Sequence, residues 1–147
     1  CGFSIEVGDK RIGALYLTAT LSKETRPRTA AEISACRYDA IGTAIANMAR
    51  VEDAIIMGDE TTLSEIVTQL TNDDPEIRFV HFADKKNKIL VSNSASALGK
   101  VYVSDLLDAG PAVMKPQGDT TKCAFSIEVG DKRIGALYLG VVKEKTK

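Results

Sequence analysis

The side chains best suited to catalysis in this 147-residue chain are few and lie in separate segments. Cys36 and His81 could form a nucleophile and a base, but no third residue or oxyanion site accompanies them, and Cys36 lies on the apolar stripe of a helical pattern. The carboxylates of Asp73, Asp74 and Glu76 belong to an acidic turn that ends a helix, and the sequence does not pair them for acid–base chemistry. We therefore expect a protein that is not an enzyme.

Motifs for cofactors, metals and nucleic acids are also missing from the sequence. Three cysteines, at positions 1, 36 and 123, are too few and too scattered for a disulfide framework or a CxxC-type zinc site. Gly130-Asp131 fits a hairpin turn and not a phosphate-binding loop. The net charge of -1 lacks the basic excess of a nucleic-acid binder. We expect no cofactor, no metal and no nucleic-acid partner.

Membrane attachment is expected only through segments that this chain does not contain. An apolar run of about 18 residues is needed to span a bilayer, and no run in the sequence approaches that length.

Nearly the same amino-acid sequence occurs near both ends of the chain. Residues 3–17 recur unchanged as residues 125–139, and 16 of the 20 positions match when residues 1–20 are aligned with 123–142. The offset of 122 residues is the size of a domain and exceeds the period of solenoid repeats. A window cut from tandem domains is the simplest interpretation; a cloning scar, a permuted design or a strand-swapping protein would give the same sequence. We therefore divide the chain into a duplicated terminal hairpin, 1–20, and a domain, 21–147.

Helical periodicity fills the first half of that domain. Thr29 and Glu32 form a capping box, and apolar residues then recur at steps of three and four, which predicts one long helix that ends near Met57 with Gly58 as its C-cap. Cys36 is expected to be a small core residue of this helix. A second capping box, Thr62 to Glu65, predicts a shorter helix that stops at residues 72–75.

The period then changes to two, which predicts β-strands. The expected strands are residues 76–84, 89–93, about 111–115, 122–129 and 133–142, with a short turn capped by Ser104 between the second and the third. Short connections make such strands antiparallel. In the last strand both the odd-numbered and the even-numbered positions are apolar. We therefore expect this strand at the centre of the sheet, covered on both faces. The fold class is α+β: a long N-terminal helix and a short second helix packed on an antiparallel sheet of about five strands.

Residues 77–100, IRFVHFADKKNKILVSNSASALGK, resemble the strand–turn–strand segment of Cache domains, the PAS-like extracytoplasmic sensors of bacterial receptors. In that family a strand ending in Asp, here Asp84, leads through a polar turn to a second strand and a loop ending in an apolar-Gly-Lys step, here residues 98–100. The run FSIEVGDKRIGALYLGV is similar to the family's final hairpin. The resemblance covers about residues 28–142 and is closest to the single-Cache type, as in periplasmic sensors of citrate and other small organic acids.

This resemblance implies a ligand pocket on the sheet face away from the long helix. His81 projects from the first strand of the segment and could donate to an anionic ligand. Lys115 and Tyr102 lie on segments that cover the pocket in the family, and Asn93 and Ser126 could add hydrogen bonds. A solvated or structural role is the alternative for each of these side chains. The Arg–His–Lys cluster of citrate sensors is not cleanly matched, so citrate is not carried over.

The function implied by the resemblance is that of a small-molecule-binding sensory domain in a bacterial signal-transduction receptor, a histidine kinase or chemoreceptor. It would be extracytoplasmic, would bind a small organic acid or amino acid, and would form a homodimer or contact a neighbouring repeat. The alternative is a non-catalytic structural or interaction unit that assembles through the duplicated hairpin, whose free strand edges suit strand addition.

Overall fold

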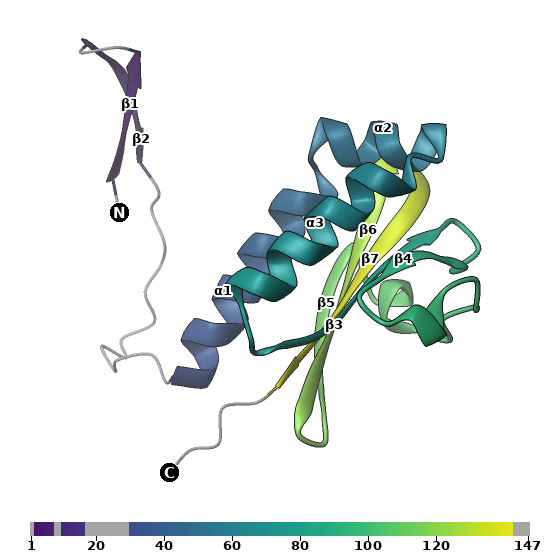
Figure 1. The fold of residues 1–147 in the computed structure, drawn as a ribbon. Coiled ribbons are helices and arrows are strands. Elements are labelled where there is room, and N and C mark those ends of the chain that lie inside the picture. Colours follow the sequence, from purple (N-terminus) through teal and green to yellow (C-terminus); the bar gives the residue numbers. More distant parts are fainter. Residues whose placement is uncertain (1, 8–9, 17–29, 143–147) are drawn as a thin grey trace.

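The computed structural model describes residues 2–7, 10–16 and 30–142 of the chain (Figure 1). The first two ranges are strands β1 (Gly2–Val7) and β2 (Lys10–Tyr16), which pair with each other as a separate two-stranded sheet. Thr29, where the first predicted capping box begins, and the predicted boundary between residues 20 and 21 lie outside the described residues. The unit that carries the candidate site is formed by residues 30–142.

That unit has the predicted α+β architecture, with helices on one face of a five-stranded antiparallel sheet. Its helices are α1 (Ala30–Ala46), α2 (Ala49–Met57) and α3 (Glu60–Asp73). Its strands are β3 (Ile77–Asp84), β4 (Ile89–Ser92), β5 (Ala112–Gln117), β6 (Thr120–Val129) and β7 (Lys132–Val142). Two short 3₁₀ turns, η1 (Ala95–Ala97) and η2 (Leu106–Asp108), lie between β4 and β5.

The last strand of the chain occupies the centre of the sheet, as its apolar sequence predicts. The strand order is β4-β3-β7-β6-β5, so β7 is hydrogen-bonded on both edges. Its side chains enter two separate cores: Leu137 and Leu139 belong to the core under the helices, whereas Ala136 and Tyr138 belong to the core on the opposite side. A strand buried on both faces needs no polar alternation.

The sheet face opposite the helices, the distal face, is partly covered by the irregular segment 94–111 (Figure 1). Leu106 of η2 is buried there together with Tyr138 and Ala124 of the sheet. Ser104 accepts from the Leu106 amide over 3.3 Å, but the N-cap position of η2 is Asp105 and not Ser104 as predicted. The chain between β4 and β5 thus roofs part of the sheet and does not cross it as a regular helix.

The prediction of one long helix from the Thr29 capping box to Met57 is wrong, because the helix breaks after residue 46. Met48 has extended backbone angles, φ -73° and ψ 127°, and α2 starts afresh at residue 49. The Asn47 side chain donates to the Thr43 carbonyl over 2.7 Å, the local competition for backbone groups that disfavours asparagine inside helices. The apolar spacing continues through the break, so periodicity alone could not reveal it. Gly58 is the C-cap as predicted, with φ 69°.

Cys36 is not a core residue, contrary to the prediction: it is exposed, and the buried side of α1 is formed by Tyr38, Gly42 and Ile45. The close approach at Gly42 fixes this orientation. A Cβ built on Gly42 would lie 2.1 Å from Cε2 of Phe125, so the helix backbone rests directly against that ring. The three- and four-residue steps placed Cys36 on the apolar stripe, whereas packing against the sheet buries the side of α1 that contains Gly42.

The predicted start of the second short helix is also wrong. The N-cap of α3 is Asp59, not Thr62: the Asp59 carboxylate accepts from the Thr62 amide over 3.2 Å and from the Thr62 hydroxyl over 2.6 Å. These hydrogen bonds from Thr62 lower the pKa of Asp59. Thr62 is therefore the capped residue, and the helix starts three residues earlier than predicted (62 − 59). The predicted stop holds, because α3 ends at Asp73.

Candidate ligand-binding site

Four aromatic rings form a cluster on the distal face. Phe79 and His81 of β3 stack with ring centroids 4.7 Å apart, and Tyr102 lies 5.4 Å from His81 and 4.5 Å from Tyr138 of β7. Phe79 and His81 are two positions apart on one strand, so both project to the same face. Tyr102 comes from the irregular segment and is held over the sheet by this cluster. The cluster thus sets the position at which segment 102–106 crosses the distal face.

His81 is an enclosed, uncharged member of this cluster. Its side chain is 6% exposed, and Nδ1 lies 2.8 Å from Ser92 Oγ on β4. Burial lowers the pKa of His81, so the imidazole is neutral at pH 7. A neutral imidazole offers a single N–H donor and no charge. His81 can therefore position Tyr102 but supplies no positive charge to an anion.

A cavity of about 180 Å³ lies beside the cluster, between segment 102–106 and strands β5 and β6. It brings together two of the predicted site residues, Tyr102 and Lys115. The residues that line it are Tyr102, Val103, Ser104, Asp105, Leu106, Lys115, Gln117 and Lys122. This set combines an apolar wall, a carboxylate, an amide and two ammonium groups.

The two lysines of the cavity face each other across the β5–β6 ladder. Lys115 pairs directly with Lys122, and within residues 30–142 neither side chain forms an ion pair. Like charges placed opposite each other on one face of an antiparallel pair destabilise it. Asp105 is the single acidic residue among those that line the cavity. The cavity is thus a place where a negatively charged group would relieve an existing repulsion.

Asn87 holds Tyr102 and Tyr138 in place through hydrogen bonds. It was not singled out from the sequence. It adopts a left-handed conformation, φ 62°, in the β3–β4 turn. Its carbonyl accepts from the Tyr102 amide over 2.8 Å, and its side-chain oxygen accepts from the Tyr138 hydroxyl over 2.7 Å. Arg133 also donates to this turn, at the Lys85 carbonyl, over 3.2 Å. The one signal in the sequence is an asparagine in a polar turn, a residue that tolerates the left-handed region.

Two other predicted residues lie outside the cavity. The Asn93 amide is fully engaged with the β3 backbone: its oxygen accepts from the Val80 amide over 2.9 Å, and its nitrogen donates to the Arg78 carbonyl over 3.1 Å. The Ser126 hydroxyl donates to Glu128 over 3.0 Å. The structure therefore gives both side chains hydrogen-bonding roles within the fold.

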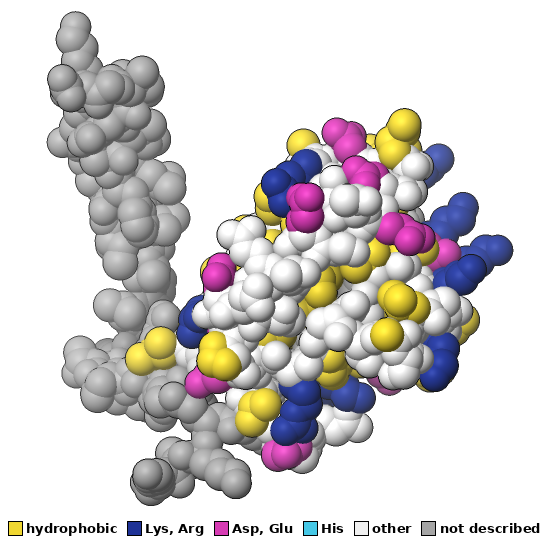
Figure 2. Space-filling view, viewed as in Figure 1, with side chains coloured by type: hydrophobic (Ala, Val, Ile, Leu, Met, Phe, Trp, Pro, Cys, Tyr) yellow, Lys and Arg dark blue, Asp and Glu magenta, His cyan; other side chains and the backbone are white. Residues whose placement is uncertain are grey.

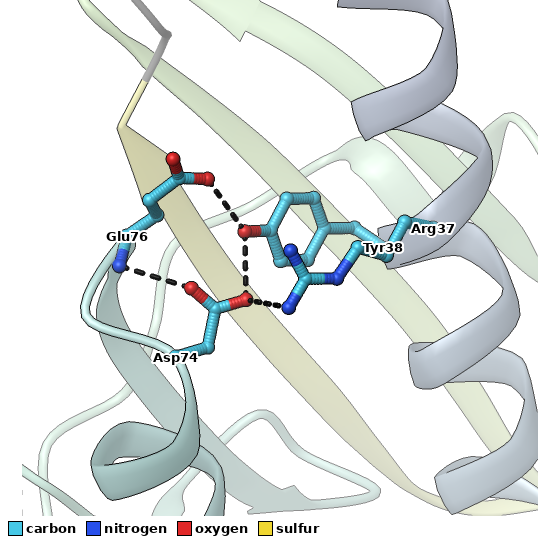
Figure 3. A network of polar contacts seen from close by, with 4 residues as sticks. All are labelled: Arg37, Tyr38, Asp74 and Glu76. Carbon is cyan, nitrogen blue, oxygen red and sulfur yellow. Dashed lines mark hydrogen bonds and ion pairs between the residues drawn. The ribbon is translucent and has the colours of Figure 1, made fainter.

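A further polar cluster lies on the helix side, where α1 meets the junction of α3 and β3 (Figure 3). The Tyr38 hydroxyl lies 2.8 Å from Asp74 Oδ2 and 3.0 Å from Glu76 Oε2, and Arg37 pairs with Asp74 over 2.9 Å. Burial, followed by the hydrogen bonds to the two carboxylates, raises the pKa of Tyr38. These contacts fasten α1 to the first strand of the sheet.

Exposed lysines outside the cavity gather at the β3–β4 turn. Lys85, Lys86 and Lys88 are exposed there, and basic side chains line that edge of the molecule in Figure 2. The strands that this turn joins, β3 and β4, are separated from β6 and β5 in the sheet by β7. These side chains give matched controls for the lysines of the cavity.

The described residues contain neither a metal-binding cluster nor a membrane-spanning helix. No group of three or more His, Cys, Asp or Glu residues there could hold a metal ion. No helix of the described part of the chain is long and apolar enough to cross a membrane.

The fold formed by residues 30–142 is that of the Cache-type, PAS-like sensor domains, which confirms the resemblance seen in the sequence at the level of fold. A histidine kinase sensor domain, that of DctB from V. cholerae, superposes with a TM-score of 0.61 at 12% identity, over 75% of this chain and 49% of that one. The extracellular domain of the proposed histidine kinase vpHK1S-Z8 gives 0.56 at 14% identity, over 74% and 50%. The single-Cache type remains a prediction.

A third similar structure is a domain of a proposed sensory box/GGDEF family protein from Vibrio parahaemolyticus, with a TM-score of 0.54 at 11% identity, over 73% of this chain and 52% of that one. The chain thus spans about half the length of each of these structures. No protein-family model matches the sequence, and no curated protein matches it significantly.

Proposed function

We propose that this chain contains the ligand-binding sensory domain of an extracytoplasmic receptor, and that it binds a small organic acid or amino acid through the carboxylate. The observation that carries the proposal is the Lys115–Lys122 pair in a cavity on the distal face. The similar solved structures are named as sensor or extracellular domains of histidine kinases, which supports a signalling role. The domain would act by binding and not by catalysis.

The chemistry of the cavity favours a compact anion with one polar and one apolar end. A carboxylate between two ammonium groups forms charge-assisted hydrogen bonds and removes their mutual repulsion. The amide of Gln117 can add a donor, and Tyr102 and Leu106 offer apolar surface. Asp105 could accept from the ammonium group of an amino acid. A volume of about 180 Å³ suits a metabolite of a few heavy atoms.

Binding would report to the rest of the receptor through segment 102–106. That segment crosses the cavity on one side and packs on the sheet through Leu106 on the other. A ligand can shift a conformational equilibrium only by its difference in affinity for the two states. A ligand held between the segment and the β5–β6 lysines binds the arrangement in which both sides are close, and so stabilises it.

The experiment is a thermal-shift screen of the full chain against organic acids, amino acids and uncharged analogues. A ligand at about 100 times its dissociation constant adds roughly 2.7 kcal/mol, which is roughly 8 °C for a domain of this size. Lys115→Ala and Lys122→Ala should each weaken a carboxylate ligand about tenfold or more, since each removes a hydrogen bond to a charged group.

Lys86→Ala is the matched control, because Lys86 is an exposed lysine away from the cavity. It should leave the ligand shift unchanged. A screen without any carboxylate hit, or a hit that Lys115→Ala and Lys122→Ala leave intact, would contradict the proposal. The homodimer or neighbouring repeat expected from the sequence remains a prediction, which sedimentation of the same samples with and without ligand would test.

A further inference from the structure

The duplicated sequence folds into the same hairpin twice. In β1–β2 Phe3 pairs with Leu15, and in β6–β7 Phe125 pairs with Leu137. Both ladders also have the same register shift, which follows the isoleucine two residues after each phenylalanine. The identical residues that the structure describes in both copies thus adopt the same strand pairing and the same register shift, with and without the rest of the sheet.

The two hairpins nevertheless have different surroundings. β6–β7 lies between β3 and β5, and its side chains Phe125 and Leu137 are at most 1% exposed. β1–β2 is a two-stranded sheet by itself. A lone hairpin is at best marginally stable in water, whereas the same residues in the sheet bury a large apolar area. The sequence of hairpin 2–16 therefore fits the central position in the sheet, but β6–β7 already occupies that position.

We propose that the two hairpins compete for one place in the sheet, and that hairpin 2–16 can replace β6–β7 between β3 and β5 of its own chain. Every element that surrounds this place, from α1 to β5, lies in residues 30–117 and is shared by the two arrangements. The alternative arrangement is a circular permutation of the same domain, with the central hairpin supplied from the N-terminal side.

The linker before α1 is long enough to make the connection that this arrangement requires. The Val142 amide donates to the Glu76 carbonyl over 2.9 Å, and the Glu76 side chain accepts from the Tyr38 hydroxyl over 3.0 Å, so β7 ends close to α1. Tyr38 is eight residues after the start of α1, which is about 12 Å along a helix. With Thr20 in the position of Val142, residues 21–29 remain to make the connection and can span up to about 30 Å. Figure 1 shows the end of β7 and the start of α1 at the same end of the molecule.

Differences at the edge of the repeat favour the C-terminal hairpin. Thr18, Ala19 and Thr20 stand where the second copy has Gly140, Val141 and Val142. A Cβ on Gly140 would lie 2.1 Å from Cε1 of Phe79, so a threonine there requires that ring to move. Val141 is 3% exposed, and alanine in its place buries less apolar surface. Hairpin 2–16 is thus the weaker competitor and should enter only when β6–β7 is impaired.

The test is a pair of matched substitutions in the full chain, Leu137→Asp and Leu15→Asp, alone and together. Each single variant should unfold cooperatively on heating, because one intact hairpin remains, and the double variant should show no folding transition. In Leu137→Asp the displaced Cys123 should react with iodoacetamide under native conditions. In the unsubstituted chain, where Cys123 is 1% exposed, it should be protected.

Adding Thr18→Gly, Ala19→Val and Thr20→Val to the Leu137→Asp variant should raise its melting temperature, since the N-terminal hairpin then matches the sequence of its twin. Gel filtration should show the Leu137→Asp variant as the same species as the unsubstituted chain. A Leu137→Asp variant as unfolded as the double variant would overturn the proposal. A folded variant that has become a larger oligomer would also overturn it, and would assign the hairpin to a second copy of the chain.

Discussion

At the scale of single residues, the sequence predicted that His81 could donate to an anionic ligand, with a structural role as the alternative, and its surroundings favour the structural role. His81 is buried, neutral and stacked on Phe79, so it builds the wall of the site. The positive charge comes instead from Lys115 and Lys122, which are opposite each other on β5 and β6. Lys115 could be singled out from the sequence, whereas Lys122 could not. Its placement depends on the register that the two-residue turn Gly118-Asp119 imposes on the hairpin.

His81 also makes stability depend on pH with a definite sign. Its pKa in the folded chain lies below the ordinary value of 6.5, so below pH 6.5 the unfolded chain binds more protons than the folded one. The free energy of unfolding should therefore fall as the pH drops below about 6.5, and this contribution should disappear in His81→Gln. Urea unfolding at pH 7.5, 6.5 and 5.5 measures it.

The comparison is clean because His81 is the single histidine of the chain. Carboxylates contribute equally to the pH dependence of both proteins, so the difference between them reports the imidazole. Identical slopes for His81→Gln and the unsubstituted chain would show that His81 titrates in the folded state as it does in water.

At the scale of elements, the strands, the Gly58 cap and the end of α3 were predictable, whereas the break in the first helix and the start of α3 were not. Strand edges are marked by a change to period two and by polar turns, and these signals are local. The break between α1 and α2 leaves the apolar spacing intact, and the cap of α3 moved to Asp59 because a stronger side-chain acceptor precedes Thr62. The side of α1 that faces the sheet depends on Phe125, 83 residues further along the chain (125 − 42 from Gly42). No local pattern contains that information.

Gly42→Ala should destabilise the domain by about 1–3 kcal/mol, because the added methyl overlaps the Phe125 ring and the core must move to admit it. This sign is the reverse of the usual one: in an exposed helix the same change stabilises by about 0.5–1 kcal/mol. Chemical denaturation of the variant measures the loss.

The matched control is Gly42→Ala combined with Phe125→Leu. The smaller leucine side chain should make room for the methyl, so the second substitution should cost less in the Gly42→Ala protein than in the unsubstituted chain. Additive losses would show that the helix does not rest on the ring.

At the scale of the whole molecule, the central strand β7 is held by more contacts than the segment 94–111 that covers the distal face. β7 is hydrogen-bonded to β3 and β6 and covered on both faces, whereas the segment 94–111 is held mainly by Leu106, Tyr102 and the Asn87 turn. Opening free energies follow such differences in burial. The proposed ligand would bind between segment 102–106 and the sheet. Segment 94–111, to which these residues belong, is the part of the domain that should open most easily.

Native-state hydrogen exchange should resolve this order. The amides of β7 should exchange most slowly, and those of residues 94–111 fastest within the described unit. A carboxylate ligand found in the screen should slow exchange in residues 102–106 far more than in β7. Slowing that is uniform over the whole domain would indicate global stabilisation without closure of segment 94–111.

The central position of β7 has a consequence for synthesis, because this strand completes the sheet and is the last of its five strands to be translated. Until residues 132–142 leave the ribosome, β3 lacks its inner partner and the core under the helices stays open to solvent. Unpaired strand edges and apolar surface of this kind promote aggregation of partly made chains. Residues 2–16 are translated before the rest of the sheet and carry the sequence of the missing hairpin. Under the proposed exchange, a nascent chain could therefore close its sheet before β6 and β7 are made, and the C-terminal hairpin would then replace the N-terminal one.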